Sequence, residues 1–282
     1  MYGMRQLLIF ILWLYLPLLA IASEEKTYVV SVVPQYPAIE LYRDWTPLLK
    51  ELERSSGLKF RLQLTDSIPE FESELLLGKF DFAYANPYHA VLANKAQQYQ
   101  PLIRDNERLL TGILVVRKDS KFHNVQELDK ATIVFPSPNA FAASLYMKTV
   151  LHNNENIQFQ ARYAESHTNA IRHVLLGKAE AGSVVVRTLE KQRIEAQNQL
   201  RTIYQTPAVL SHPLISHPRV GADVAKAFQQ AMIGLSQSKS GKRLLENVNL
   251  QDPVITSYKE YKHLESLRLN YSLQIHQYQG EY

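Results

Sequence analysis

The chain contains one junction twice, as Leu76-Leu77-Gly78-Lys79-Phe80-Asp81-Phe82 and, 99 residues later, as Leu175-Leu176-Gly177-Lys178-Ala179-Glu180-Ala181. In both copies a helical pattern ends in two leucines, a Gly-Lys pair supplies the helix stop, and a strand pattern follows. Two copies flanked by the same order of strands and helices indicate two units built on one plan. We expect the acidic residues, Asp81 and Glu180, to face water at the strand starts rather than to form a catalytic pair.

Strand and helix patterns alternate around the first copy. The β-branched and aromatic run at 27–33 predicts a buried strand that Pro34 closes, and apolar residues at helical spacing follow until Gly57. The predicted elements are a strand at 27–33, a helix at 39–57, a strand at 60–64, a helix at 69–78 and a strand at 80–84. This order is typical of a mostly parallel sheet covered by helices.

The same order recurs around the second copy. The predicted elements there are a strand at 131–135, a helix at 140–151, a strand at 159–163 and a helix at 168–176. Strand-like runs at 109–116 and 203–207 would carry the chain between the two units, and helices at 220–236 and 258–267 would complete the first. We therefore predict an α/β fold of two lobes, residues 23–110 with 206–282 and residues 111–205, with a ligand cleft between them.

The first residues predict secretion. Arg5 precedes an apolar run from Leu7 to Ala22, which ends in Ala20-Ile21-Ala22 before Ser23. This is typical of a cleavable signal peptide at 1–22, whereas a retained anchor would need a longer run without Pro17. The chain has no cysteine, which excludes disulfides, thiolate metal sites and a lipidated N-terminal cysteine. We expect a soluble protein of the periplasm.

Composition and motifs exclude several classes of function. The 31 basic and 27 acidic residues are scattered, without the basic stripe that a nucleic-acid partner would need. The sequence contains no glycine-rich phosphate loop, nucleophile elbow or zinc-protease motif, so we predict neither an enzyme nor a cofactor. His212-Pro213 and His217-Pro218 lack a third ligand nearby, so we predict a surface loop there and no metal site.

Four motifs together resemble one family. They are Trp45-Thr46-Pro47-Leu48-Leu49, Gly78-Lys79-Phe80-Asp81-Phe82-Ala83-Tyr84, Phe135-Pro136-Ser137-Pro138-Asn139-Ala140-Phe141-Ala142-Ala143-Ser144 and Ser166-His167-Thr168-Asn169-Ala170. The family is the phosphate, phosphite and phosphonate-binding group of periplasmic proteins, and the similarity runs from about Val29 to Leu267. The resemblance implies the type II two-lobed fold, a monomer, a small anionic ligand and the membrane permease of an ABC transporter as partner.

The resemblance places part of the ligand site at two helix starts. Free N–H groups of a first helical turn, with a favourable dipole, can replace the water shell of an oxyanion. Ser137, Asn139, Ala140 and Phe141 lie at the first start, where relatives have Pro-Asn-Ser-Thr-Ser-Gly, so the backbone donors persist but the hydroxyls do not. Asn139 would contact the ligand, cap the helix or do both.

The second helix start carries a histidine that relatives direct at the ligand. His167 aligns with it, and Thr168 stands where binders of amino-bearing phosphonates usually have a carboxylate. A ligand ammonium group would therefore lose its counter-charge here. His167 could also be a polar residue in solvent at the helix start.

Four residues of the first unit complete the predicted site. Tyr84, Asn86 and Tyr88 follow a strand, and ligands bind beyond the carboxyl ends of parallel strands. Tyr36, just after the first strand, is also a candidate. Two tyrosines that relatives use are replaced by Ile68 and Ala85, which predicts a less polar site.

Two functions are compatible with this site. The first is capture of a small anionic solute for an ABC transporter, and the second is a sensory role in which the closed form docks on a membrane histidine kinase or chemoreceptor. The sequence does not identify the ligand, and a periplasmic hydrolase would need a catalytic group of residues brought together only by folding.

Overall fold

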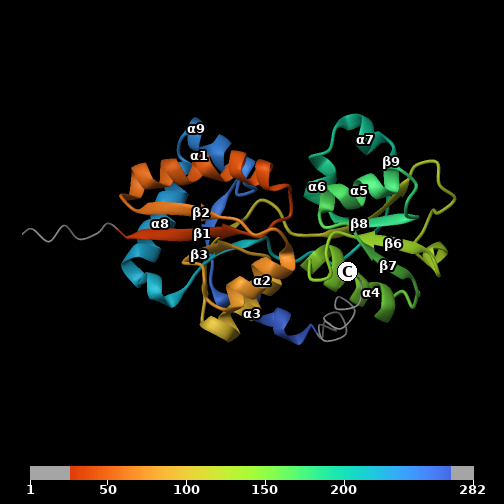
Figure 1. Cartoon of the computed structure of the whole chain (residues 1–282), viewed down its shortest axis with the longest axis horizontal. Helices are drawn as coiled ribbons and strands as arrows, with labels where there is room; N and C mark the ends of the chain where they lie inside the picture. Colours follow the sequence, from red (N-terminus) through yellow and green to blue (C-terminus); the bar gives the residue numbers. More distant parts are fainter. Residues whose placement is uncertain (1–25, 268–282) are drawn as a thin grey trace, which may run out of the picture.

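The computed structural model describes residues 26–267, and the predicted signal peptide at 1–22 lies outside this range. Figure 1 shows two lobes side by side, each with its own sheet between helices. The chain starts in the first lobe, passes through the second and returns to the first. None of the helices within 26–267 has the length and apolar character needed to cross a membrane.

The sheet of the first lobe has six strands in the order β11-β4-β10-β3-β1-β2. In chain order they are β1 (Thr27–Val32), β2 (Lys59–Gln63), β3 (Phe82–Tyr84), β4 (Gln100–Asp105), β10 (Pro213–Ser216) and β11 (Pro253–Ile255). Strands β2 and β3 flank β1 and run parallel to it, whereas β10 is antiparallel to both β3 and β4. The returning chain therefore supplies a central strand of the first sheet.

Helices cover both faces of this sheet (Figure 1). They are α1 (Ala38–Ser56), α2 (Ile68–Leu76), α3 (Pro87–Gln97), α8 (Ala222–Leu235), α9 (Lys239–Asn247) and α10 (Tyr258–Tyr261), with the short 3₁₀ helices η3 (Pro218–Val220) and η4 (Lys262–Ser266). Helix α1 buries an apolar face that includes Trp45 and Leu48 against the core. It ends at Gly57, whose φ of 72° lies in the left-handed region that glycine adopts without strain.

The sheet of the second lobe has five strands in the order β7-β6-β8-β5-β9. They are β5 (Gly112–Arg117), β6 (Thr132–Phe135), β7 (Gln160–Tyr163), β8 (Ala181–Val185) and β9 (Leu200–Gln205). The helices are η1 (Gln126–Leu128), η2 (Phe141–Tyr146), α4 (Met147–Asn153), α5 (His167–Leu175), α6 (Val186–Glu190) and α7 (Ile194–Asn198). Strand β6 is parallel to β7 and β8, as β1 is to β2 and β3.

The repeated junction has the same geometry in both lobes. Ser67 and Ser166 cap α2 and α5 with φ, ψ of −145°, 160° and −145°, 159°. The acidic residue that follows each junction binds the neighbouring strand: Asp81 accepts the N–H of Val29 at 2.8 Å, and Glu180 accepts that of Thr132 at 2.9 Å.

The expectation that both acids face water is wrong for Asp81. It is only 6% exposed because Arg219 of the returning chain pairs with it at 2.7 Å. The sequence around Asp81 gave no indication of this partner, which lies in a distant segment.

Two segments cross between the lobes and pair with each other. Leu110 and Val209 exchange both backbone hydrogen bonds, at 2.8 and 3.0 Å. The predicted crossing strands at 109–116 and 203–207 correspond to β5 and β9, shifted by one to three residues at their ends.

The helix predicted at 140–151 begins differently from a regular α-helix. Residues 141–146 form a π-helix, in which the N–H of Leu145 reaches the carbonyl of Ala140 at 3.0 Å, and α4 continues from it. The wider turn brings the carbonyl oxygen of Ala142 to 2.3 Å from where a Cβ on Gly112 would lie, so only glycine fits at the start of β5.

Candidate functional site

Two adjoining cavities lie between the lobes. A smaller and a larger cavity share four lining residues: Gln35, Leu110, Val185 and His212. These four come from the end of β1, both crossing segments and the end of β8. The cavities therefore lie where the carboxyl ends of the strands of both sheets meet, the expected position of a ligand in an open α/β fold.

The smaller cavity is mostly apolar, with a few polar groups. Its other lining residues are Val33, Ile68, Asn86, Ala140, Phe141, Ala142, Ala143 and His167. Asn86 caps α3, because its Oδ1 accepts the N–H of His89 at 2.7 Å. The other polar side chains of its lining are Gln35 and the imidazoles of His167 and His212.

These two histidines come from different segments and are both buried. His167 is the first residue of α5 and is 2% exposed, and His212 immediately precedes β10 and is 6% exposed. His167 Nδ1 and His212 Nε2 find no hydrogen-bond partner within residues 26–267. A buried polar atom without a partner costs free energy, and an oxyanion ligand would supply the acceptor that an imidazole N–H needs.

Burial keeps both imidazoles neutral. It lowers the pKa of His167 to about 3, and it lowers the pKa of His212 to about 3 with smaller contributions from His89 and His167. A bound anion would stabilise the protonated form and raise these pKa values. Neutral or protonated, an imidazole can donate a hydrogen bond to an oxyanion.

The first three residues of η2 line the same cavity and have free backbone N–H groups. Those of Phe141, Ala142 and Ala143 have no acceptor in the described part of the chain, as expected for a first helical turn. The residue before η2 is Ala140, which makes no side-chain cap, so Asn139 does not act as the helix cap. Asn139 Oδ1 instead accepts the hydroxyl of Ser137 at 2.9 Å.

Aromatic rings connect the lobes beside this cavity. The Phe141 ring of the second lobe stacks on Tyr88 of α3 in the first, with centroids 5.8 Å apart and planes at 12°. It also stacks on Tyr146, with centroids 5.8 Å apart. The Phe141–Tyr88 pair is thus a direct contact between the lobes.

The structure brings six of the ten predicted site residues to the cavities. Asn86, Ala140, Phe141 and His167 line the smaller one, and Tyr36 and Tyr84 line the larger one. The other four, Tyr88, Ser137, Asn139 and Thr168, line neither. The possibility that His167 faces solvent is excluded by its burial.

The sequence interpretation missed His212. The prediction of a surface loop at 212–218 is wrong, because the segment Pro213–Ser216 is the central strand β10 and His212 stacks on Tyr84 with centroids 5.4 Å apart. The apolar run Pro213-Leu214-Ile215 was the signal for a buried strand. Between Lys26 and Leu267, no group of three side chains is arranged to hold a metal ion.

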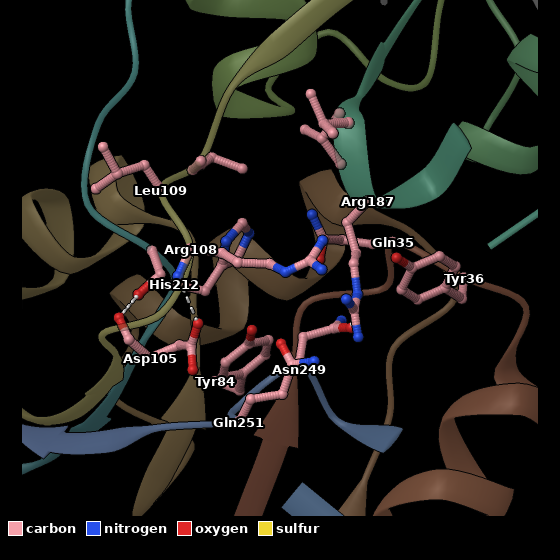
Figure 2. A pocket seen from close by; sticks show the side chains of 14 residues that line it. Gln35, Tyr36, Tyr84, Asp105, Arg108, Leu109, Arg187, His212, Asn249 and Gln251 are labelled. Carbon is pink, nitrogen blue, oxygen red and sulfur yellow. Dashed lines mark hydrogen bonds between the residues drawn. The ribbon is translucent and has the colours of Figure 1, made fainter. Parts of the chain in front are cut away.

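Figure 2 shows the larger cavity, where Tyr84, His212, Arg187 and Gln35 surround one space. Its lining residues that are not shared with the smaller cavity are Tyr36, Tyr84, Asp105, Arg108, Leu109, Val186, Arg187, Ser211, Asn249 and Gln251. Tyr36 is buried near Thr188 and Asn249, and burial raises the pKa of its phenol. The phenol therefore stays protonated and serves as a hydrogen-bond donor.

Comparisons with known proteins agree with this geometry. The sequence profile of the family described as "ABC transporter, phosphonate, periplasmic substrate-binding protein" matches residues 30–261. A search of curated proteins found no significant match.

Solved structures share the fold at low sequence identity. A binding protein component of an ABC phosphonate transporter from Pseudomonas aeruginosa is 14% identical over 86% of each chain, with a TM-score of 0.77. A Prochlorococcus marinus protein solved with methylphosphonate is 18% identical over 86% of this chain and 97% of its own, also with a TM-score of 0.77. A Xanthomonas citri protein solved with ATP is 14% identical over 86% and 98%, with a TM-score of 0.69. Because the family profile spans most of the chain, this protein belongs to the periplasmic substrate-binding proteins of phosphonate ABC transporters.

Proposed function

We propose that this protein binds a phosphonate or a closely related small oxyanion between its lobes and delivers it to the permease of an ABC transporter. The observation that carries the proposal is that His167 and His212, each with a buried ring nitrogen that has no partner within residues 26–267, line one cavity together with the first residues of η2. Such donors are arranged for an oxyanion, and no catalytic group is needed for capture and release.

The proposed site has an apolar wall and a polar wall. The imidazoles and the first-turn N–H groups of η2 and α5 bind the oxygens, while Val33 and Ile68 contact the carbon side of the ligand. The Prochlorococcus marinus relative was solved with methylphosphonate, a ligand that has these two sides. This chemistry favours an alkylphosphonate over inorganic phosphate, because phosphate would present an oxygen to the apolar wall.

The lobe boundaries support a closing mechanism. We assign residues 23–110 and 206–282 to the first lobe and 111–205 to the second, since all strands of the second sheet lie between 112 and 205. The Leu110–Val209 pair is then the hinge. A ligand that contacts His167 and His212 together would favour the closed form, which a permease could distinguish from the open form.

The cellular setting follows from the same proposal. The protein is a monomer of the periplasm, exported by a signal peptide at 1–22 that is then cleaved. A sensory role on a kinase or chemoreceptor would use the same closed form; the absence of hydroxyl side chains at Ala140 and Ala142 is the feature that favours it. Pull-down of the liganded protein with membranes that contain the permease or the receptor would separate the two roles.

Titration calorimetry with the mature protein tests the proposed ligand class. The panel is methylphosphonate, phosphite, phosphate, methanesulfonate and acetate, and we expect methylphosphonate to bind most tightly. Absence of binding by every phosphorus oxyanion in the panel would contradict the proposal.

A further inference from the structure

A single oxyanion group bound in the smaller cavity would leave the larger cavity unoccupied. Its volume is about 80 Å³, compared with about 10 Å³ in the smaller cavity. Because the two share Gln35, Leu110, Val185 and His212, a ligand bound in the smaller cavity can extend into the larger one. The residues that line the larger cavity therefore determine what the second part of the ligand can be.

Arg187 is the most informative of these residues. It lies at the start of α6 in the second lobe, is half-buried, and donates from Nε to Asn249 Oδ1 of the first lobe at 2.8 Å. Its two terminal nitrogens donate to no atom of the chain between 26 and 267, and no carboxylate there forms an ion pair with it. A half-buried guanidinium that has only a neutral amide as partner is incompletely compensated.

The other charged groups of the larger cavity already have partners. Both carboxylate oxygens of Asp105 accept backbone N–H groups, from Arg108 at 3.0 Å and from Asp252 at 2.8 Å. The Arg108 guanidinium forms an ion pair with Glu190. Among residues 26–267, Arg187 is thus the cation of this cavity that has no anionic partner.

Neutral donors surround the free side of Arg187. Figure 2 shows its side chain between Gln35, Tyr36 and Asn249, at the part of the cavity away from Asp105. The Tyr36 phenol and the side-chain amides can each donate a hydrogen bond to an anion that pairs with the guanidinium. A carboxylate or phosphate bound by the two terminal nitrogens of Arg187 would have a planar, bidentate partner.

We propose that the ligand has two anionic groups: a phosphonate in the smaller cavity and a carboxylate or second phosphorus oxyanion in the larger cavity, held by Arg187. The inference rests on the proposed function, because it takes the first group to occupy the site at His167 and His212. It gives the substrate class as a phosphonocarboxylate or a short bisphosphorus compound. An aminoalkylphosphonate is disfavoured, since the Arg187 guanidinium would repel its ammonium group.

Calorimetry with three ligands that share the phosphonate group tests the proposed substrate class. The ligands are methylphosphonate, phosphonoacetate and 2-aminoethylphosphonate, measured with the mature wild-type protein. Phosphonoacetate should bind about 10 to 100-fold more tightly than methylphosphonate, the size expected for a charge-assisted bidentate contact, and 2-aminoethylphosphonate more weakly than either. Equal affinity for phosphonoacetate and methylphosphonate would overturn the inference alone, whereas no binding of any of the three would overturn the proposed function with it.

Three variants test whether Arg187 causes the preference for phosphonoacetate. Arg187→Gln should remove the advantage of phosphonoacetate and change the affinity for methylphosphonate less than about twofold. Arg193→Gln, which removes the same charge from an exposed position of the same lobe, should keep that advantage. If Arg187→Gln weakened both ligands equally, Arg187 would be a latch between the lobes and the inference would be wrong; Arg187→Lys, which keeps the charge without the planar fork, should retain part of the preference.

Discussion

Ile68 and His167 are the first residues of equivalent helices in the two lobes, and both side chains line the same cavity. Each follows a serine cap with nearly the same backbone angles, so the repeat that is visible in the sequence places the two side chains at the same cleft from opposite sides. Their chemistry differs, because the first lobe contributes an apolar contact and the second an unpartnered imidazole. The unpartnered imidazole nitrogens at this cavity thus come from the second lobe and from His212 of the returning chain.

His167→Ala should weaken binding of methylphosphonate by about 10 to 100-fold. The variant removes a hydrogen bond to a charged group, which contributes about 1.5–3 kcal/mol. Calorimetry measures the change, and His152→Ala, an exposed histidine of the same lobe, is the control that should bind as the wild type does. An unchanged affinity in His167→Ala would mean that the imidazole does not touch the ligand.

Stability of the ligand-free protein should fall as the pH is lowered from about 6.5 toward 3. The pKa of His167 falls from 6.5 in the unfolded chain to about 3 in the folded one, so below pH 6.5 the unfolded state binds a proton that the folded state does not. Each such histidine reduces the free energy of unfolding by about 1.4 kcal/mol per pH unit within this window. Denaturant unfolding across pH 4–6 measures this dependence. In His167→Gln the slope of the free energy of unfolding against pH should be smaller than in the wild type by about 1.4 kcal/mol per pH unit, the contribution of one proton.

The exposed His152→Gln is the control for that slope. Its side chain is exposed in the folded chain, so the substitution should leave the pH dependence unchanged. A wild-type slope equal to that of His167→Gln would show that His167 is protonated in the folded state, contrary to its burial.

Ala142→Ser should strengthen oxyanion binding by about 3 to 10-fold. The side chain lines the smaller cavity, and a hydroxyl there adds a donor worth about 0.5–1.5 kcal/mol. Ala231→Ser, in helix α8 away from the cavities, should not alter affinity. Weaker binding in Ala142→Ser would indicate that the apolar wall, rather than a missing donor, determines what this cavity accepts.

Gly112→Ala should destabilise the protein by roughly 2 kcal/mol or more. Its Cβ would lie 2.3 Å from the carbonyl oxygen of Ala142, so either β5 or the π-helix η2 must shift. Gly234→Ala in α8 is the matched control, because nothing lies within 4 Å of its Cβ and alanine should stabilise a helix by up to about 1 kcal/mol. Thermal unfolding compares the two, and equal melting temperatures would contradict the close contact.

The sequence predicted the lobes better than it predicted the site. The Gly-Lys junctions, the alternating strands and helices and the position of His167 are local patterns, and all are present in the structure. His212, Arg187 and the partner of Asp81 were not found because their roles depend on contacts between segments far apart in the chain. The π-helix at 141–146 was also not predicted, and its close contact with Gly112 joins segments about 30 residues apart in the chain.

The crystal structure of the mature protein with methylphosphonate is the measurement that tests the central claim most directly. We expect the phosphonate oxygens in the smaller cavity, within hydrogen-bond distance of both His167 Nδ1 and His212 Nε2 and of the first N–H groups of η2. A phosphonate bound elsewhere, or one in contact with neither imidazole, would contradict it.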